Sequence, residues 1–109
     1  MGQNKLLSML GICRKAGQLT MGMDVVLEGI AKDKIFTVLL TQDLSRRSNE
    51  KITAAAVHKS VRIITAPLGM DEIAALTGKA SGIIGITDKG LADAVESIIC
   101  RMKEEGIAL

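Results

Sequence analysis

Short β-branched runs alternate with amphipathic stretches along the chain, and this alternation restricts the possible folds more than any other feature of the sequence. Apolar residues recur at helical spacing in the segments Asn4–Lys15, Gly22–Ala31, Asn49–Ser60, Met70–Leu76 and Leu91–Lys103. Shorter apolar segments typical of strands lie between them: Leu19–Met21, Ile35–Thr41, Val61–Thr65 and Ile83–Ile86. Strands that alternate with helices favour a sheet covered on both faces.

We therefore predict an α/β fold, a three-layer α/β/α sandwich around a small mixed sheet built from these four strands. Periodicity leaves the order of the strands within the sheet open. The 109 residues correspond to one domain, residues 1–109, because domains have roughly 100–200 residues. Ser48 and Asp88 are the expected caps of the third helix and the last helix.

The composition excludes several classes of protein. One Phe and the absence of Tyr and Trp argue against an RRM sheet or an OB-type groove, which stack bases on several aromatic side chains. No apolar run approaches the roughly 18–20 residues of a membrane span, and the polar start Met1–Asn4 lacks the pattern of a signal peptide. We therefore expect a cytoplasmic protein without a membrane partner, in which Cys13 and Cys100 are buried thiols and His58 is a surface residue.

The sequence contains no constellation of residues typical of catalysis, of metal binding or of a cofactor site. Gly78-Lys79 resembles the end of a P-loop, but Ile73 and Ala80 stand where the motif requires Gly and Ser or Thr. His58 is the single histidine, and no two Cys or His residues have the spacing of metal ligands. We therefore predict a protein that is not an enzyme and that needs no cofactor or metal.

The basic residues are distributed unevenly. The net charge of the chain is +2, but residues 1–87 carry a balance of +4 and residues 88–109 a balance of −2. Basic residues cluster at Arg14-Lys15, at Lys32 with Lys34, and at Arg46-Arg47. If the loops 17–24, 42–48 and 79–82 meet at one edge, they form a basic rim that contacts phosphates. The alternative is that these residues are scattered, solvated charges.

Gly22 stands at a predicted junction between a strand and a helix, within Met21-Gly22-Met23-Asp24. A glycine there permits close approach of a ligand to the backbone. The amides that follow it form a helix N-terminus, which favours anions. The alternative is that Gly22 is only a turn residue, and Asp24 would then complement the charge of the helix end.

The order of elements resembles that of the kink-turn-binding ribosomal protein family, which includes archaeal L-seven-Ae and eukaryotic L-thirty-e, and in particular its bacterial YlxQ-type branch. The resemblance extends from about Lys5 to Ile98 and rests on these segments: Arg14-Lys15-Ala16-Gly17, Gly22, Val38-Leu39-Leu40-Thr41-Gln42-Asp43 and Gly85-Ile86-Thr87-Asp88-Lys89-Gly90. It implies an α/β/α sandwich without enzymatic activity that binds sharply bent RNA beside tandem sheared G·A pairs.

The family motif Gly-x-Asn-Glu-x-x-Lys is only partly present. Gly22 matches it, whereas Asp24, Val25 and Glu28 stand in place of Asn, Glu and Lys. Asp24 lacks the amide donor, and Val25 cannot accept a hydrogen bond from a guanine edge. Glu28 reverses a charge that faces phosphate. Lys32, one turn further, is expected from the residues alone to restore some positive charge.

We predict a non-enzymatic RNA-binding protein that recognises structured, bent RNA, including kink-turn and ribosomal RNA, associates with the ribosome or translation, and is a monomer or weak homodimer without DNA specificity. The expected RNA-binding residues are Arg14, Lys15, Gly22, Met23, Asp24, Lys32, Lys34, Gln42, Lys79, Ala80, Ser81 and Gly82. The alternative is a protein–protein interaction module of the same fold that has lost kink-turn recognition, with Met23 and Val25 in an apolar contact patch.

Overall fold

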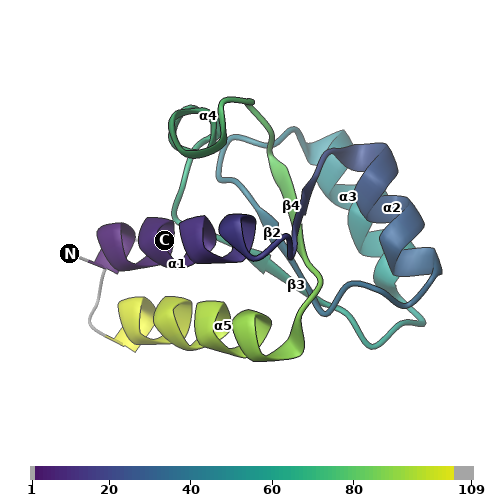
Figure 1. The fold of residues 1–109 in the computed structure, drawn as a ribbon. Helices are drawn as coiled ribbons and strands as arrows, with labels where there is room; N and C mark the ends of the chain where they lie inside the picture. Colours follow the sequence, from purple (N-terminus) through teal and green to yellow (C-terminus); the bar gives the residue numbers. More distant parts are fainter. Residues whose placement is uncertain (1, 105–109) are drawn as a thin grey trace.

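The computed structural model describes residues 2–104, and within them each predicted helix and strand is present in the predicted order (Figure 1). The helices are α1 (Gly2–Lys15), α2 (Met23–Ala31), α3 (Arg46–Ala56), α4 (Met70–Thr77) and α5 (Lys89–Glu104). The strands are β1 (Leu19–Met21), β2 (Thr37–Leu40), β3 (Arg62–Thr65) and β4 (Ile83–Ile86). Helices α1, α4 and α5 cover one face of the sheet, and α2 and α3 cover the other (Figure 1). The predicted three-layer sandwich is confirmed.

The strand order is β1-β4-β2-β3, which the sequence pattern left open. Strand β4 is antiparallel to both β1 and β2, and β2 is parallel to β3. Strands β1, β2 and β3 therefore run in one direction and end at the same end of the sheet, where β4 begins. We call this the upper end, as it lies in Figure 1, and we define it by residues 22–24, 41–45, 66–70 and 78–82.

Alternate residues of each strand face the two helical layers, as the pleat of a sheet requires. Leu39 and Ile84 are buried against α1, α4 and α5, whereas Val38, Leu40 and Ile83 are buried against α2 and α3. Burial of these aliphatic side chains on both faces is the main stabilising contribution, at roughly 1.5–3 kcal/mol for each fully buried residue. The sheet thus forms a rigid platform for the loops at its upper end.

Four helix starts differ from the predictions: α1 begins at Gly2 instead of Asn4, α2 begins at Met23 instead of Gly22, and α3 and α5 also begin earlier than predicted. Helix α3 begins at Arg46, because the Ser45 hydroxyl accepts the Ser48 backbone N–H at 3.2 Å; Ser45 and not Ser48 is the cap. Helix α5 begins at Lys89, two residues early, and the Asp88 carboxylate accepts the Leu91 N–H at 2.9 Å. The prediction that Asp88 caps this helix is confirmed.

The two cysteines have different environments. Cys13 is buried, as predicted, and burial raises the pKa of its thiol. The prediction for Cys100 is wrong, because this residue lies on the exposed side of α5. His58 is exposed, as predicted. Each helix within residues 2–104 is too short or too polar to cross a lipid bilayer.

Candidate nucleic-acid interface

Backbone hydrogen bonds bring three separate loops together at the upper end of the sheet. The Gly22 N–H donates to the Ile83 carbonyl at 3.0 Å, and the Thr41 N–H donates to the Gly82 carbonyl at 3.0 Å. The segments that follow β1 and β2 therefore flank the segment that precedes β4. Gly17, which the sequence placed in the first of these loops, lies at the opposite, lower end, because Leu19 pairs with Ile86.

Gly22 has a backbone that only glycine adopts without strain. Its φ of 100° and ψ of 153° lie in a region essentially restricted to glycine. A Cβ atom at this position would meet no heavy atom within 4 Å, so the space in front of the backbone is open. Helix α2 starts here without a side-chain cap. Gly22 therefore presents bare backbone at the upper end.

The two neighbours of Gly22 on α2 differ in exposure. Asp24 is exposed in the first turn of the helix. Met23 is half-buried, and its side chain packs against the core between the sheet and α2 and α3. Of the two residues predicted to accompany Gly22 at the RNA, Asp24 is thus accessible as a side chain, and Met23 is largely part of the core.

The segment between α4 and β4 supplies a cation and a tight turn. Lys79 and Ala80 are exposed, and the Ser81 hydroxyl donates to the Ile83 carbonyl at 3.1 Å. Gly82, one of the predicted RNA-binding residues, is buried. A Cβ atom on Gly82 would lie within 2.7–2.9 Å of side-chain atoms of Leu44, Met70 and Thr41. The absence of a side chain there accommodates the neighbouring loops.

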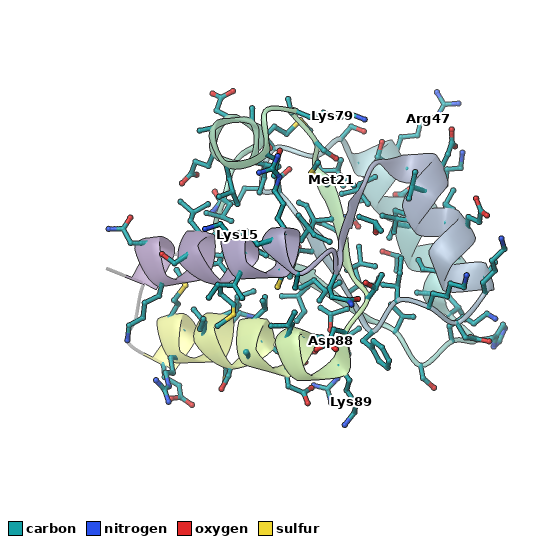
Figure 2. The ribbon with its side chains drawn as sticks, viewed as in Figure 1. Lys15, Met21, Arg47, Lys79, Asp88 and Lys89 are labelled. Carbon is teal, nitrogen blue, oxygen red and sulfur yellow. The ribbon has the colours of Figure 1, made fainter. Side chains whose placement is uncertain are left out.

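Arg14 reaches the same region from α1. Its guanidinium donates to the Thr77 carbonyl at 3.4 Å, near the C-terminal end of α4 and two residues before Lys79. Figure 2 shows Met21, Lys79 and Arg47 at the upper end, Asp88 and Lys89 at the lower end, and Lys15 on α1 between them. Gln42 is exposed at the upper end, and its backbone N–H donates to the Leu68 carbonyl at 2.9 Å.

Lys32 and Lys34 are not brought together with the other predicted residues. They lie between the end of α2 and the start of β2, at the lower end of the sheet. Lys32 forms an ion pair of 2.6 Å with Glu28, so it neutralises this carboxylate and does not add positive charge for phosphates. The hydrogen bond from Lys32 holds the pKa of Glu28 below its usual range. Lys34 lines a small hollow of about 220 Å³ with Val25 and Glu28.

The cations at the two ends of the sheet have different partners. At the lower end, Lys59 pairs with Asp33 at 3.3 Å and also donates to the last carbonyl of α2, that of Ala31, at 3.2 Å. Lys59 therefore places a positive charge at the C-terminus of α2, where the helix dipole favours it. Two further ion pairs lie at this end: Arg62 pairs with Glu96 at 2.9 Å, and Lys89 pairs with Asp93 at 3.9 Å.

At the upper end, by contrast, Arg14, Lys79 and Arg47 form no ion pair within residues 2–104, nor does Lys15 on α1. Their positive charge is therefore available to a ligand.

The N-termini of α2 and α3 also lie at the upper end and add positive potential, which Asp24 in the first turn of α2 partly offsets. Helix α4 both begins and ends here, and Asp71 and Glu72 stand in its first turn, so it adds no net positive potential. The upper end thus offers a polyanion cations without an acidic partner among the described residues, next to the exposed carboxylates Asp24 and Asp43. At the lower end the cations other than Lys34 are paired with carboxylates.

Asp43 connects two loops of the upper end. Both of its carboxylate oxygens accept the Met70 backbone N–H, at 3.1 Å each, so this residue after β2 caps the start of α4. The neighbouring Thr41 hydroxyl and the Met70 N–H hold the pKa of Asp43 below its usual range. The bond from Met70 is the one that the geometry bears out, because the buried Thr41 hydroxyl has no hydrogen-bond partner among the described residues. The sequence analysis did not select Asp43, although a carboxylate in the loop after a strand is typical of a residue that fixes the loop.

The pKa of Asp43 predicts a pH dependence of stability. Because the folded pKa is depressed, this contribution is full above pH 3.8, the ordinary pKa, and is lost as the pH falls through the lower folded value. Asp43→Asn removes the titration. We expect the difference in urea midpoint between the native chain and Asp43→Asn to be largest near neutral pH and to shrink below pH 4. A difference independent of pH from 3 to 7 would contradict this role.

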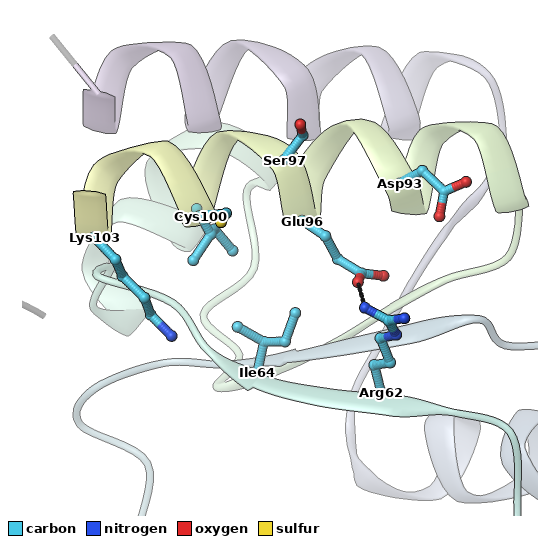
Figure 3. A pocket seen from close by; sticks show the side chains of 8 residues that line it. Arg62, Ile64, Asp93, Glu96, Ser97, Cys100 and Lys103 are labelled. Carbon is cyan, nitrogen blue, oxygen red and sulfur yellow. Dashed lines mark hydrogen bonds and ion pairs between the residues drawn. The ribbon is translucent and has the colours of Figure 1, made fainter. Parts of the chain in front are cut away.

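A groove of about 460 Å³ lies away from the upper end, between β3 and α5 (Figure 3). Two of its charged groups bind each other, because the Glu96 carboxylate accepts the Arg62 guanidinium at 2.9 Å. The same carboxylate accepts the Thr37 hydroxyl at 2.5 Å. Cys100 and Lys103 line the other half. Among the described residues, no three His, Cys, Asp or Glu side chains gather in a way that could hold a metal ion.

The structure is a three-layer α/β/α sandwich, and at its upper end an open glycine backbone lies with cations that have no acidic partner among the described residues. Residues 4–96 match the ribosomal protein L7Ae/L30e/S12e/Gadd45 family, and the chain belongs to this family. The resemblance inferred from the sequence is thus confirmed.

The chain is similar to bacterial members of this family. It is 24% identical over 97 residues to the RNA-binding protein YlxQ of Enterococcus faecium, a match that covers 89% of this chain and 93% of that protein. It is 27% identical over 96 residues to the RNA-binding protein YlxQ of Bacillus subtilis (strain 168), covering 84% and 91%. These relatives support the assignment to the bacterial branch.

Two solved structures share the fold. A protein of unknown function from Bacillus halodurans superposes with a TM-score of 0.80 at 22% identity, covering 88% of this chain and 97% of that one. The Giardia lamblia 15.5kD RNA binding protein superposes with a TM-score of 0.67 at 14% identity, covering 94% and 88%.

Proposed function

We propose that this protein binds structured, bent RNA through the upper end of its sheet, in the cytoplasm and in association with the ribosome or translation. The observation that carries the proposal is the convergence of an open glycine backbone with cations that have no acidic partner, Arg14 and Lys79. The membership in a ribosomal-protein family and the similarity to proteins named as RNA-binding support it.

The residues at the upper end favour recognition of RNA by shape. Asp24 and Val25 offer no side-chain donor to a base edge, and Val25 cannot accept a hydrogen bond either. The open backbone of Gly22 permits close approach of a ribose or phosphate, and Lys79 neutralises phosphate charge. RNA is commonly recognised in this way, through its bent backbone and its 2′-hydroxyl groups.

The alternative function, a protein-interaction module, requires a continuous apolar surface. Val25 is 52% exposed, but Met23 packs into the core and does not extend this surface. The other exposed large apolar residues lie on separate elements: Ile12 on α1, Phe36 before β2 and Val57 after α3. Single exposed apolar residues are normal on a soluble surface. The structure therefore favours RNA over a protein partner.

The proposal is tested by titrating the protein with a kink-turn RNA and with a straight duplex of equal length, each at two salt concentrations. We expect tighter binding to the bent RNA at both salt concentrations, and weaker binding to both RNAs at higher salt because release of counterions into a more concentrated salt solution is less favourable. Equal and weak binding to the two RNAs would remove the claim of shape recognition.

Gly22→Val tests whether the open glycine contacts RNA. We expect RNA affinity to fall at least about tenfold, since the side chain would occupy the open space, and stability to fall by about 1–3 kcal/mol through backbone strain. The matched control is Gly17→Val at the lower end, where φ is also positive (71°) and the space is also open. An equal loss of affinity in both variants would mean that strain, and not contact, is responsible.

A further inference from the structure

Helix α3 places its charges against its own dipole. Acidic residues stand in the first turns of α2 (Asp24) and α4 (Asp71, Glu72), where they stabilise a helix N-terminus. The first turn of α3 has no acidic residue and instead begins with Arg46 and Arg47. Cations at this position destabilise a helix, so stability alone does not account for them.

Two cations of α3 remain without a partner. Arg46 pairs with Glu50 at 2.9 Å, four residues along the helix. Arg47 and Lys51, also four residues apart and hence on one side of the helix, are exposed and form no ion pair within the described chain. Figure 2 shows Arg47 at the upper end of the molecule, as it shows Lys79 and Met21.

The neighbouring helix α2 has the opposite character. Its exposed residues after Gly22 are Asp24, Val25 and the ion pair Glu28–Lys32, which together carry no positive charge. Helices α2 and α3 pack side by side on the same face of the sheet, and both begin at the upper end. If a polyanion bound at the upper end extends along the layer formed by α2 and α3, the cations of α3 attract it and the surface of α2 does not.

We infer that bound RNA continues from the loops of the upper end over the N-terminal half of α3, where Arg47 and Lys51 contact its phosphates. This inference rests on the proposed RNA binding and specifies its path. The two positions are separated by about 6 Å along the helix axis, at 1.5 Å per residue, so two phosphates of one strand can be engaged at once. Both residues act as backbone contacts that carry no base specificity.

The test measures binding of a kink-turn RNA to Arg47→Gln/Lys51→Gln as a function of salt. The control is Arg101→Gln/Lys103→Gln, two exposed residues of α5 that also form no ion pair within residues 2–104, so the net charge changes equally. We expect the slope of log K against log salt to become shallower by about 1.4–1.8 in the α3 variant, because each phosphate contact contributes about 0.7–0.9, and to change little in the control.

Stability gives a second readout with the opposite sign. Removal of Arg47 from the first turn of α3 is expected to leave the urea midpoint unchanged or to raise it, while RNA affinity falls. A merely structural role for Arg47 would lower the midpoint.

The outcomes separate the path from the function. An unchanged salt slope in the α3 variant, while the native chain binds the bent RNA, overturns the path and leaves RNA binding at the upper end intact. A slope that falls equally in the α3 variant and the α5 control also overturns the path. If the native chain does not bind the bent RNA at all, the proposed function and the path both fail.

Discussion

Reversal of charge at Arg14 and Lys79 is expected to weaken RNA binding by about 100-fold at 0.1 M salt. Each residue changes from attraction to repulsion toward phosphate, which amounts to about 1–2 kcal/mol per site in a solvent-like dielectric. Two sites together then change the free energy of binding by about 3 kcal/mol, or two orders of magnitude. The measurement is a titration of Arg14→Glu/Lys79→Glu with a kink-turn RNA.

The matched control is Lys34→Glu/Lys89→Glu at the lower end, which has the same net charge. Neither pair of positions is buried, so both variants are expected to fold like the native chain. We expect the control to lose less than about tenfold in affinity, through the general effect of net charge. Comparable losses in the two variants would show that RNA responds to total charge and does not select the upper end.

Leu39→Ala is expected to have the largest effect on stability. Leu39 is 1% exposed in β2, a central strand, where it packs in the core between the sheet and α1, α4 and α5. Truncation removes buried apolar surface and leaves a cavity, which costs about 3 kcal/mol or more. In a domain of this size the melting temperature should fall by about 15 °C, measurable by circular dichroism.

Val57→Ala provides the comparison for Leu39→Ala, since Val57 is 64% exposed and should change stability by less than about 0.5 kcal/mol. RNA affinity of the folded Leu39→Ala protein at low temperature should remain close to that of the native chain, because no loop of the upper end contains Leu39. A loss of stability below 1 kcal/mol would mean that the two-faced core is not the main stabilising feature.

The layers of the fold could be predicted from sequence because burial produces a clear pattern. The continuous apolar run at Val38–Leu40 indicates a strand buried on both faces, and the structure buries it so. The start of α3 was misplaced by three residues, because Ser45 and Ser48 are both good caps and only the hydrogen bond to the Ser48 N–H distinguishes them. The prediction that Cys100 is buried is wrong because it rested on the usual burial of cysteine. The position of Cys100 on α5 faces solvent.

The candidate site was predicted less completely, since it depends on strand direction. Gly22 and Lys79 could be selected from the sequence because a glycine and a cation in loops are visible there, and the structure places both at the upper end. Lys32 and Lys34 were grouped with them wrongly, because only the observed pairing of the strands shows that they lie at the opposite end. Arg47 was noted as part of a basic pair, but the misplaced helix start concealed that it opposes the helix dipole.

The central claim is that RNA binds the upper end of the sheet, and mapping of backbone amide chemical shifts during titration with a kink-turn RNA tests it most directly. We predict that the shifts concentrate in residues 22–25, 41–51 and 78–82. Residues 32–36, 58–61 and 87–90 at the lower end should remain nearly unchanged. Shifts concentrated at the lower end, or along the groove between β3 and α5, would contradict the account.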